Sequence, residues 1–413
     1  MKINETVRED GLRIITGKVP SKKVFVQMIA GVGSAYDPEG KDGLFHYFEH
    51  MAFKGSGRRN INEIRDFARK NILQSNASTG RLQTEFHGEA VRHKFSLLCD
   101  YICDIFFNSI YPADEVEREK EVVFNEIARD WDQDNYAVYF LLWENLWEKN
   151  PMRIFGVGSP DGVKSITREN LLEAKQKWYV PSNTLAIGIG PIEHEKFVEE
   201  INQRVPLNHS KTEHLSWADE YLILPKNKEV VLLRPKREKA TLVYGCKFPM
   251  FKEEKANAVL QVLEYMLVKG SASLLWNEIR EKRGLAYTVS GGVGGSYPLA
   301  LDFTVYSEML PNRVDEVREL INKFVHKNLE HNCSFEDTKE YLYDWYSLST
   351  ENLNTWANFI SEKNKFGEPV KLAERQFQRY CNLIKSVTFD NVEDMRSELL
   401  KQEKFVTVVI KPS

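Results

Sequence analysis

Two histidines and a glutamate lie within five consecutive residues, as His46, Glu49 and His50. Residues three and four apart share one face of an α-helix, so a helix would bring these three side chains together. Imidazoles are common zinc ligands, and a carboxylate beside them can take a proton from water. The spacing therefore predicts a patch, about one helical turn long, suited to metal-assisted hydrolysis.

The segment that must hold this patch is predicted to be a helix over residues 42–54. Its apolar residues follow helical spacing and are expected to face the core; they are Leu44, Phe45, Phe48, Met51 and Ala52. His46, Glu49 and His50 then form the adjacent strip. A single histidine on a helix is usually structural or solvated, and the pairing of two around Glu49 is what favours a metal site.

A catalytic zinc usually has three protein ligands and one open position, so a third ligand is needed. The segment Glu115–Asp130 is strongly helical in pattern, and Glu119 and Glu126 lie seven residues apart on one face. An apolar stripe is predicted on the same helix at Val116, Val122, Val123 and Ile127. The alternative interpretation is a charged, solvated helix surface, and the residues alone leave both open.

An internal repeat organises the chain. Residues Glu49–Arg65 and Glu264–Arg280 align without a gap at a constant offset of 215, and nine of the seventeen positions are identical. Such a density of matches indicates two homologous halves from an old duplication.

The repeat shows where the halves differ. His46 aligns with Gln261 and His50 with Tyr265, so the second copy lacks both imidazoles. If the first half binds metal, the second half contributes something else.

Strand-like and helical segments are mixed in both halves without strict alternation, which predicts an α+β fold rather than a doubly wound parallel sheet. At 413 residues the chain is too long for one core. We predict a first domain over residues 1–208, a polar linker over 209–228 and a homologous second domain over 229–413.

The composition is that of an ordinary globular protein, with 42% hydrophobic and 28% charged residues and a formal net charge of -4. No long basic stretch is present, so neither nucleic acid nor membrane is expected as a partner. No signal peptide and no transmembrane helix are expected either. The cysteines are an odd, scattered set, which predicts reduced thiols and a cytoplasmic location; they are Cys99, Cys103, Cys246, Cys333 and Cys381. Cys99 and Cys103 lie four residues apart in an apolar helical segment and are expected to be buried.

His46-x-x-Glu49-His50 is also the inverted zincin signature. Together with Glu126, which follows His50 by 76 positions in Val122–Ile127, it resembles the pitrilysin/insulysin family of zinc peptidases, which includes the mitochondrial processing peptidase. The resemblance implies one zinc ion per chain, bound by His46, His50 and Glu126. It implies that Glu49 is the general base and that Glu119 orients a ligand from outside the coordination sphere.

Two further segments resemble the same family. Leu274–Val289 contains Arg280 and Tyr287, which the resemblance implies contact the substrate near the scissile bond. From the residues alone, local packing of both side chains is the alternative. Residues Asn76, Ala77, Ser78, Thr79 and Thr84 resemble an edge strand that pairs with extended substrate by main-chain hydrogen bonds.

The resemblance implies a zinc endopeptidase acting on peptides or unfolded segments inside a clamshell chamber. Family members build that chamber from four related domains, and this chain accounts for two. A homodimer is therefore expected, with a heterodimer of related subunits as the other assembly. A non-catalytic assembly or peptide-binding subunit is the alternative function, and no feature of the sequence identifies the physiological substrate.

Overall fold

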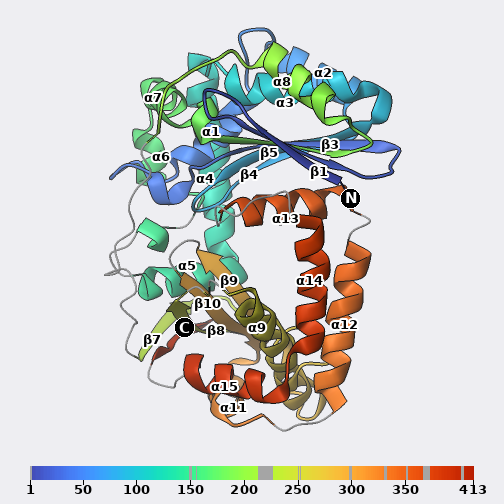
Figure 1. The fold of residues 1–413 in the computed structure, drawn as a ribbon. Helices are drawn as coiled ribbons and strands as arrows, with labels where there is room; N and C mark the ends of the chain where they lie inside the picture. The colour runs from blue at the N-terminus through green and yellow to red at the C-terminus, as the bar shows by residue number, and fades with distance from the viewer. Residues whose placement is uncertain are drawn as a thin grey trace. The chain divides into compact units, whose positions relative to one another are not determined.

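Figure 1 shows the fold in a computed structural model, which describes residues 2–147, 151–154, 156–212, 227–249, 251, 253–296, 300–329, 333–349, 352–365, 373–400 and 404–413. The chain forms two compact units. The first contains Met1–Arg129, Ile154–Ser216 and Thr350–Arg375, and the second contains Asp130–Arg153, Trp217–Ser349 and Gln376–Ser413. Residues 213–226 of the predicted linker lie outside the described residues.

The first unit is built on a six-stranded mixed sheet in the order β1-β2-β6-β3-β5-β4 within the described residues. The strands are β1 (Lys2–Val7), β2 (Arg13–Lys18), β3 (Lys23–Ala30), β4 (Gln74–Thr79), β5 (Thr84–Val91) and β6 (Thr184–Gly190). The helices of this unit are α1 (Leu44–Ala52), α2 (Ile61–Asn71), α3 (Phe95–Phe107), α4 (Ala113–Asp132, which ends in the second unit), α6 (Pro160–Ser165), α7 (Arg168–Trp178), α8 (His194–Arg204) and α13 (Leu353–Lys365).

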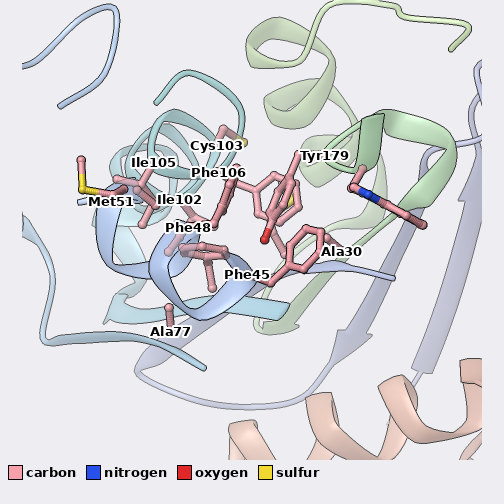
Figure 2. Close-up of a cluster of buried hydrophobic side chains, with 14 of the residues drawn as sticks. Ala30, Phe45, Phe48, Met51, Ala77, Ile102, Cys103, Ile105, Phe106 and Tyr179 are labelled. Carbon is pink, nitrogen blue, oxygen red and sulfur yellow. The ribbon is translucent and has the colours of Figure 1, made fainter. Parts of the chain in front are cut away.

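The main core of this unit lies between the sheet and its helices. The apolar residues predicted for the helix over 42–54 are all buried there. Figure 2 shows Phe45, Phe48 and Met51 of α1 packed with aromatic and aliphatic side chains of α3, and Phe48 stacks on Tyr179 with ring centroids 3.9 Å apart. Cys99 and Cys103 of α3 are free and buried in the same core, as predicted.

The opposite face of the first sheet is covered by α13, a helix from the second half of the sequence that contacts β3 and β6 (Figure 1). Successive strand residues point to opposite faces, and Phe25, Ile29 and Ile187 are buried yet lie outside the main core. On α13, Trp356 and Ile360 are buried in turn. The sequence pattern did not predict this cover, because it depends on a contact between segments more than 150 residues apart.

The second unit contains a five-stranded sheet in the order β7-β11-β8-β10-β9 within the described residues. Its strands are β7 (Lys228–Arg234), β8 (Ala240–Pro249), β9 (Ala286–Ser296), β10 (Ala300–Met309) and β11 (Val406–Pro412). Its helices are α5 (Asp134–Leu146), α9 (Glu254–Leu267), α10 (Leu274–Trp276), a π-helix (Asn277–Glu281), α11 (Val314–His326), α12 (Cys333–Ser349), α14 (Ala373–Ser386, which begins in the first unit) and α15 (Phe389–Leu399).

The predicted repeat is visible in the order of these elements. In each unit a helix that starts the repeat is followed by a loop and a second helical segment, which are α1 and α2 in the first unit and α9, α10 and the π-helix in the second. Ile64 and Ile279 occupy equivalent repeat positions and both are buried. The predicted α+β class with two repeated domains is confirmed.

Candidate metal centre

His46 and His50 of α1 and Glu126 of α4 come together in the first unit, with one ligand atom of each within 4.8 Å of the others. Glu126 Oε2 lies 3.3 Å from His50 Nε2 and 3.8 Å from His46 Nε2. The other carboxylate oxygen of Glu126 accepts a hydrogen bond of 3.1 Å from Arg129. One oxygen and two ring nitrogens therefore converge on a single point.

This donor set fits a zinc ion. Zinc binds imidazole nitrogen and carboxylate oxygen at about 2.0–2.2 Å, which puts the ligands of a tetrahedral site about 3.3–3.5 Å apart. The two separations from Glu126, 3.3 and 3.8 Å, are close to that geometry, and all three ligand atoms lie within 4.8 Å of one another. Among the described residues no second group of three such ligands occurs, so the fit is confined to this place.

Glu119 precedes Glu126 by seven residues, about two helical turns, on the same face of α4, and it contacts His50 from the side away from Glu126. Its carboxylate accepts a hydrogen bond of 2.9 Å from His50 Nδ1 and pairs with Lys54 Nζ at 2.5 Å. A carboxylate on Nδ1 fixes the ring orientation and directs Nε2 toward the convergence point. Lys54, whose ammonium group pairs with Glu119, was not singled out in the sequence; its position four residues after His50 was the available signal.

The pKa values of the two histidines are shifted in opposite directions. Burial lowers the pKa of His46 to about 4, with the neighbouring His50 adding to the effect. Burial also opposes charge on His50, but hydrogen bonds to Glu119 and Glu126 outweigh it and raise its pKa to about 9. The hydrogen bond from His50 lowers the pKa of Glu126 to about 2. A carboxylate that stays ionised is the form that ligates a cation.

Glu49 lies between the two histidines and is only partly exposed. Burial raises the pKa of its carboxyl group, and a hydrogen bond from Thr79 opposes that rise. The Thr79 hydroxyl lies 2.6 Å from Glu49 Oε2. A raised pKa brings a carboxylate closer to the value that suits a general base near neutral pH.

Two sets of hydrogen bonds hold helix α1 in place, one at its first turn and one to α4. Its first backbone N–H groups are bound by a carboxylate from outside the helix, because Asp37 accepts from Gly43 N at 2.6 Å and from Phe45 N at 3.0 Å. Gly43 has no side chain with which to cap the helix itself. On the other side, the Tyr47 hydroxyl donates to the Val116 carbonyl and ties α1 to α4.

The predicted substrate strand corresponds to β4, which lies at the edge of the first sheet. Asn76 and Ser78 are exposed on one side of β4, while Ala77 is buried against the core. Thr84 lies instead in β5, where it is fully buried and donates its hydroxyl hydrogen to the Val32 carbonyl. The side chain of Thr84 is thus turned into the protein interior.

One detail of the helix prediction was wrong. Val116, Val123 and Ile127 are buried, as expected, but Val122 is 48% exposed. The buried face of α4 runs through positions 116, 119, 123 and 127, and Val122 falls outside it because it is only one residue from Val123.

Arg280 and Tyr287 are neighbours in the second unit. The Arg280 guanidinium carbon lies 4.9 Å from the Tyr287 ring centroid and 4.1 Å from that of Trp276. Tyr287 stands at the start of β9 and is 73% exposed, so its ring is on the surface of the unit apart from the contact with Arg280. Arg280 belongs to the π-helix, a distortion that is often found at functional sites.

Comparison with family models places this geometry in a known context. The model described as Insulinase (Peptidase family M16) matches residues 13–154, and the model described as Peptidase M16 inactive domain matches residues 165–342. The chain belongs to the M16 peptidase family. The predicted resemblance to the pitrilysin/insulysin peptidases is confirmed.

Relatives and solved structures agree with this M16 assignment. A protein named an uncharacterized zinc protease from Rickettsia bellii is 26% identical over 320 residues, covering 76% of this chain and 74% of its own. A protease from Helicobacter pylori has the same fold, with a TM-score of 0.87 at 18% identity and full coverage of both chains. The periplasmic protease PqqL from Escherichia coli has a TM-score of 0.78 at 14% identity; the match covers 99% of this chain and 47% of that one.

In the second copy the positions that align with His46 and His50 are occupied by Gln261 and Tyr265, which contact tyrosine side chains. The Gln261 amide donates to the Tyr346 hydroxyl at 2.7 Å, and its oxygen accepts from the Tyr380 hydroxyl at 3.1 Å. Tyr265 packs on Tyr341, with ring centroids 5.7 Å apart. Because these positions hold glutamine and tyrosine, the second copy offers no imidazole at either of them.

Proposed function

We propose that this chain is a zinc-dependent endopeptidase that hydrolyses peptides or extended polypeptide segments. The observation that carries the proposal is the convergence of His46, His50 and Glu126, with Glu119 behind His50. One zinc ion per chain is the expected stoichiometry. Bound there, zinc would supply Lewis acidity toward a carbonyl group and an acidified water.

Different residues of the chain then transfer the proton and position the substrate. Glu49 takes the proton of the attacking water and passes it to the leaving amine. Arg280 and Tyr287 donate hydrogen bonds to the developing oxyanion or to nearby carbonyls, where losing one donor typically costs about 3 kcal/mol of barrier. Their contact with each other and the exposure of Tyr287 support this role.

The edge position of β4 supports a binding mode in which substrate adds a strand. Its outer main-chain groups can hydrogen-bond an extended peptide with little demand on the peptide sequence. We assign Asn76, Ala77, Ser78 and Thr79 to this strand. Thr84 is left out of it because its hydroxyl is engaged with Val32 inside the unit.

A homodimer is the proposed assembly, and a heterodimer with a related subunit is the other one. A cytoplasmic location stays a prediction; the buried free thiols of Cys99, Cys103, Cys246 and Cys381 are consistent with it. No helix among the described residues is long and apolar enough to cross a membrane.

The proposal is tested with Glu49→Gln, using zinc analysis and a quenched-peptide cleavage assay. The expected result is about one zinc per chain in both proteins and at least a 100-fold loss of kcat in the variant, because general-base catalysis is typically worth about 10²- to 10⁴-fold. Glu117→Gln is the matched control, since Glu117 is exposed on α4 and paired with Lys120.

The second candidate function, a non-catalytic assembly or peptide-binding subunit, is favoured by the match of residues 165–342 to a domain described as inactive. It predicts peptide binding with no cleavage by the parent protein. Cleavage that is unchanged by Glu49→Gln would instead contradict the role of Glu49 and with it the proposed chemistry.

A further inference from the structure

Resting on the proposed function, we propose that Thr79 is a positioning residue that holds the Glu49 carboxylate and links it to the substrate-binding edge strand. Thr79 is the last residue of β4. Its backbone belongs to the strand that would pair with substrate, and its side chain contacts the proposed general base. One residue thus joins two parts of the site.

The direction of the hydrogen bond follows from the available protons. The Thr79 hydroxyl has one hydrogen and two nearby acceptors, Glu49 Oε2 at 2.6 Å and the Phe45 carbonyl oxygen at 3.4 Å. A charged acceptor at the shorter distance gives the stronger bond, so the hydrogen points to Glu49. Oε2 is then engaged by Thr79, and Oε1 is left for the proton transfer.

The Glu49 carboxylate has no other side-chain hydrogen bond or ion pair among the described residues. The nearest ligand side chains, His46 and His50, are directed at Glu126 and not at Glu49. A glutamate side chain has three rotatable bonds, and burial alone leaves several orientations accessible. The Thr79 hydroxyl is therefore the contact that selects one of them.

Thr79 is itself well fixed. It pairs with Thr84 in the β4–β5 register, and the turn that follows is closed by a hydrogen bond of 2.8 Å from Gly80 N to the Gln83 carbonyl. A Cβ on Gly33 would lie 2.1 Å from the Gly80 oxygen, so the chain at Gly33 lies directly against this turn. Because Thr79 is fixed by its own strand and turn, its hydroxyl can hold the Glu49 carboxylate in one position. A displacement of about 1 Å of a catalytic group can cost about 10²-fold in rate.

Because the same residue forms the edge strand, a peptide that pairs with β4 also steadies the support of the base. A contact that orients the base acts on the chemical step more than on substrate affinity. Thr79 should therefore affect kcat, whereas a residue that only pairs with the substrate backbone should affect KM.

The test compares Thr79→Val, which keeps the shape and removes the hydroxyl, with Thr79→Ser, which keeps the hydroxyl. We expect Thr79→Val to lower kcat about 10- to 100-fold with KM within about threefold and with zinc content unchanged. Thr79→Ser should stay within about fivefold of the parent. Ser75→Ala is the matched control on the same strand, because the Ser75 hydroxyl contacts Tyr101 instead of the site.

Three outcomes would overturn the inference: parental kcat in Thr79→Val, an equal loss in the valine and serine variants, or a loss confined to KM. If Thr79→Val does not fold, as judged by circular dichroism and zinc content, Thr79→Ala is measured in its place under the same criteria. Glu49→Gln separates the two proposals. Full activity in Glu49→Gln contradicts the proposed function, whereas an inactive Glu49→Gln with a fully active Thr79→Val contradicts the role of Thr79 alone.

Discussion

Glu119 illustrates how a buried carboxylate can stay charged beside a histidine that we propose as a zinc ligand. It is buried between the Lys54 ammonium group and the His50 ring. Burial opposes its charge, and the hydrogen bonds from His50 and Lys54 overcome that effect and lower its pKa. It therefore stays ionised near neutrality, and a negative charge on Nδ1 increases the donor strength of Nε2.

Replacing Glu119 with glutamine should weaken zinc binding about 10- to 100-fold, because the charge on the His50 partner is lost while the three ligands remain. The measurement is a competition titration against a chromophoric zinc chelator. Glu117→Gln, on the exposed side of the same helix, should leave the affinity within about twofold of the parent. An unchanged affinity in Glu119→Gln would show that His50 is oriented by other contacts.

The residues of the candidate metal centre could be predicted from sequence to the extent that they depend on helical periodicity. Positions 46 and 50, and positions 119 and 126, had to share a face once each segment was helical. That the two helices meet was implied only by the family resemblance. The contact between Glu49 and Thr79 could not be predicted, because it depends on where a strand 30 residues away ends relative to α1.

At the scale of elements, the two halves of the chain exchange a segment. Residues 130–153 join the second unit, where α5 packs on β8 and β11, and residues 350–375 join the first, where α13 packs on β3 and β6. Adding the repeat offset of 215 to residues 130–153 gives residues 345–368. This range nearly coincides with residues 350–375, the segment of the second half that joins the first unit. The two exchanged segments therefore occupy equivalent positions in the repeat. The sequence of one copy alone would instead suggest that its helix packs in its own half.

Removing the buried side chain of Ile360 should destabilise the first unit where α13 packs on β3 and β6. Ile360 is fully buried, and cutting such a side chain to alanine typically costs about 2–5 kcal/mol. Ile360→Ala should therefore speed hydrogen exchange of the β3 and β6 amides, about 170–340 residues away in sequence. Exposed Asn358 lies on the same helix, and Asn358→Ala should leave that exchange unchanged. Equal exchange in both variants would mean that α13 does not stabilise the sheet.

At the scale of the whole molecule, the chain matches about half of a longer protease. The chain corresponds to 47% of the Escherichia coli protease, and the solved first half of that protease matches all of this chain, with a TM-score of 0.78. A two-unit chain is thus similar to half of a longer one. If four units are needed for a chamber, two copies of this 48.0 kDa chain supply them, and a closed two-fold dimer is the commonest way to do so.

A homodimer could place the zinc half of one copy against the Arg280 and Tyr287 half of its partner. Mixing two inactive variants distinguishes this arrangement from a site completed within one chain. Chains with Glu49→Gln have a defective zinc half, and chains with Tyr287→Phe have a defective second half. In a mixed dimer with shared sites, one site receives both defects and the other receives neither.

Random exchange makes half of the dimers mixed, so activity should recover to about one quarter of the parental value. Subunit exchange is verified with two affinity tags, and light scattering should give about twice the mass of the chain. Differently tagged Glu49→Gln chains mixed with each other should stay inactive, which controls for nonspecific recovery. Demonstrated exchange without recovery would mean that Glu49 and Tyr287 of the same chain serve the same site, and the partner copy would then complete the chamber without contributing to the chemistry.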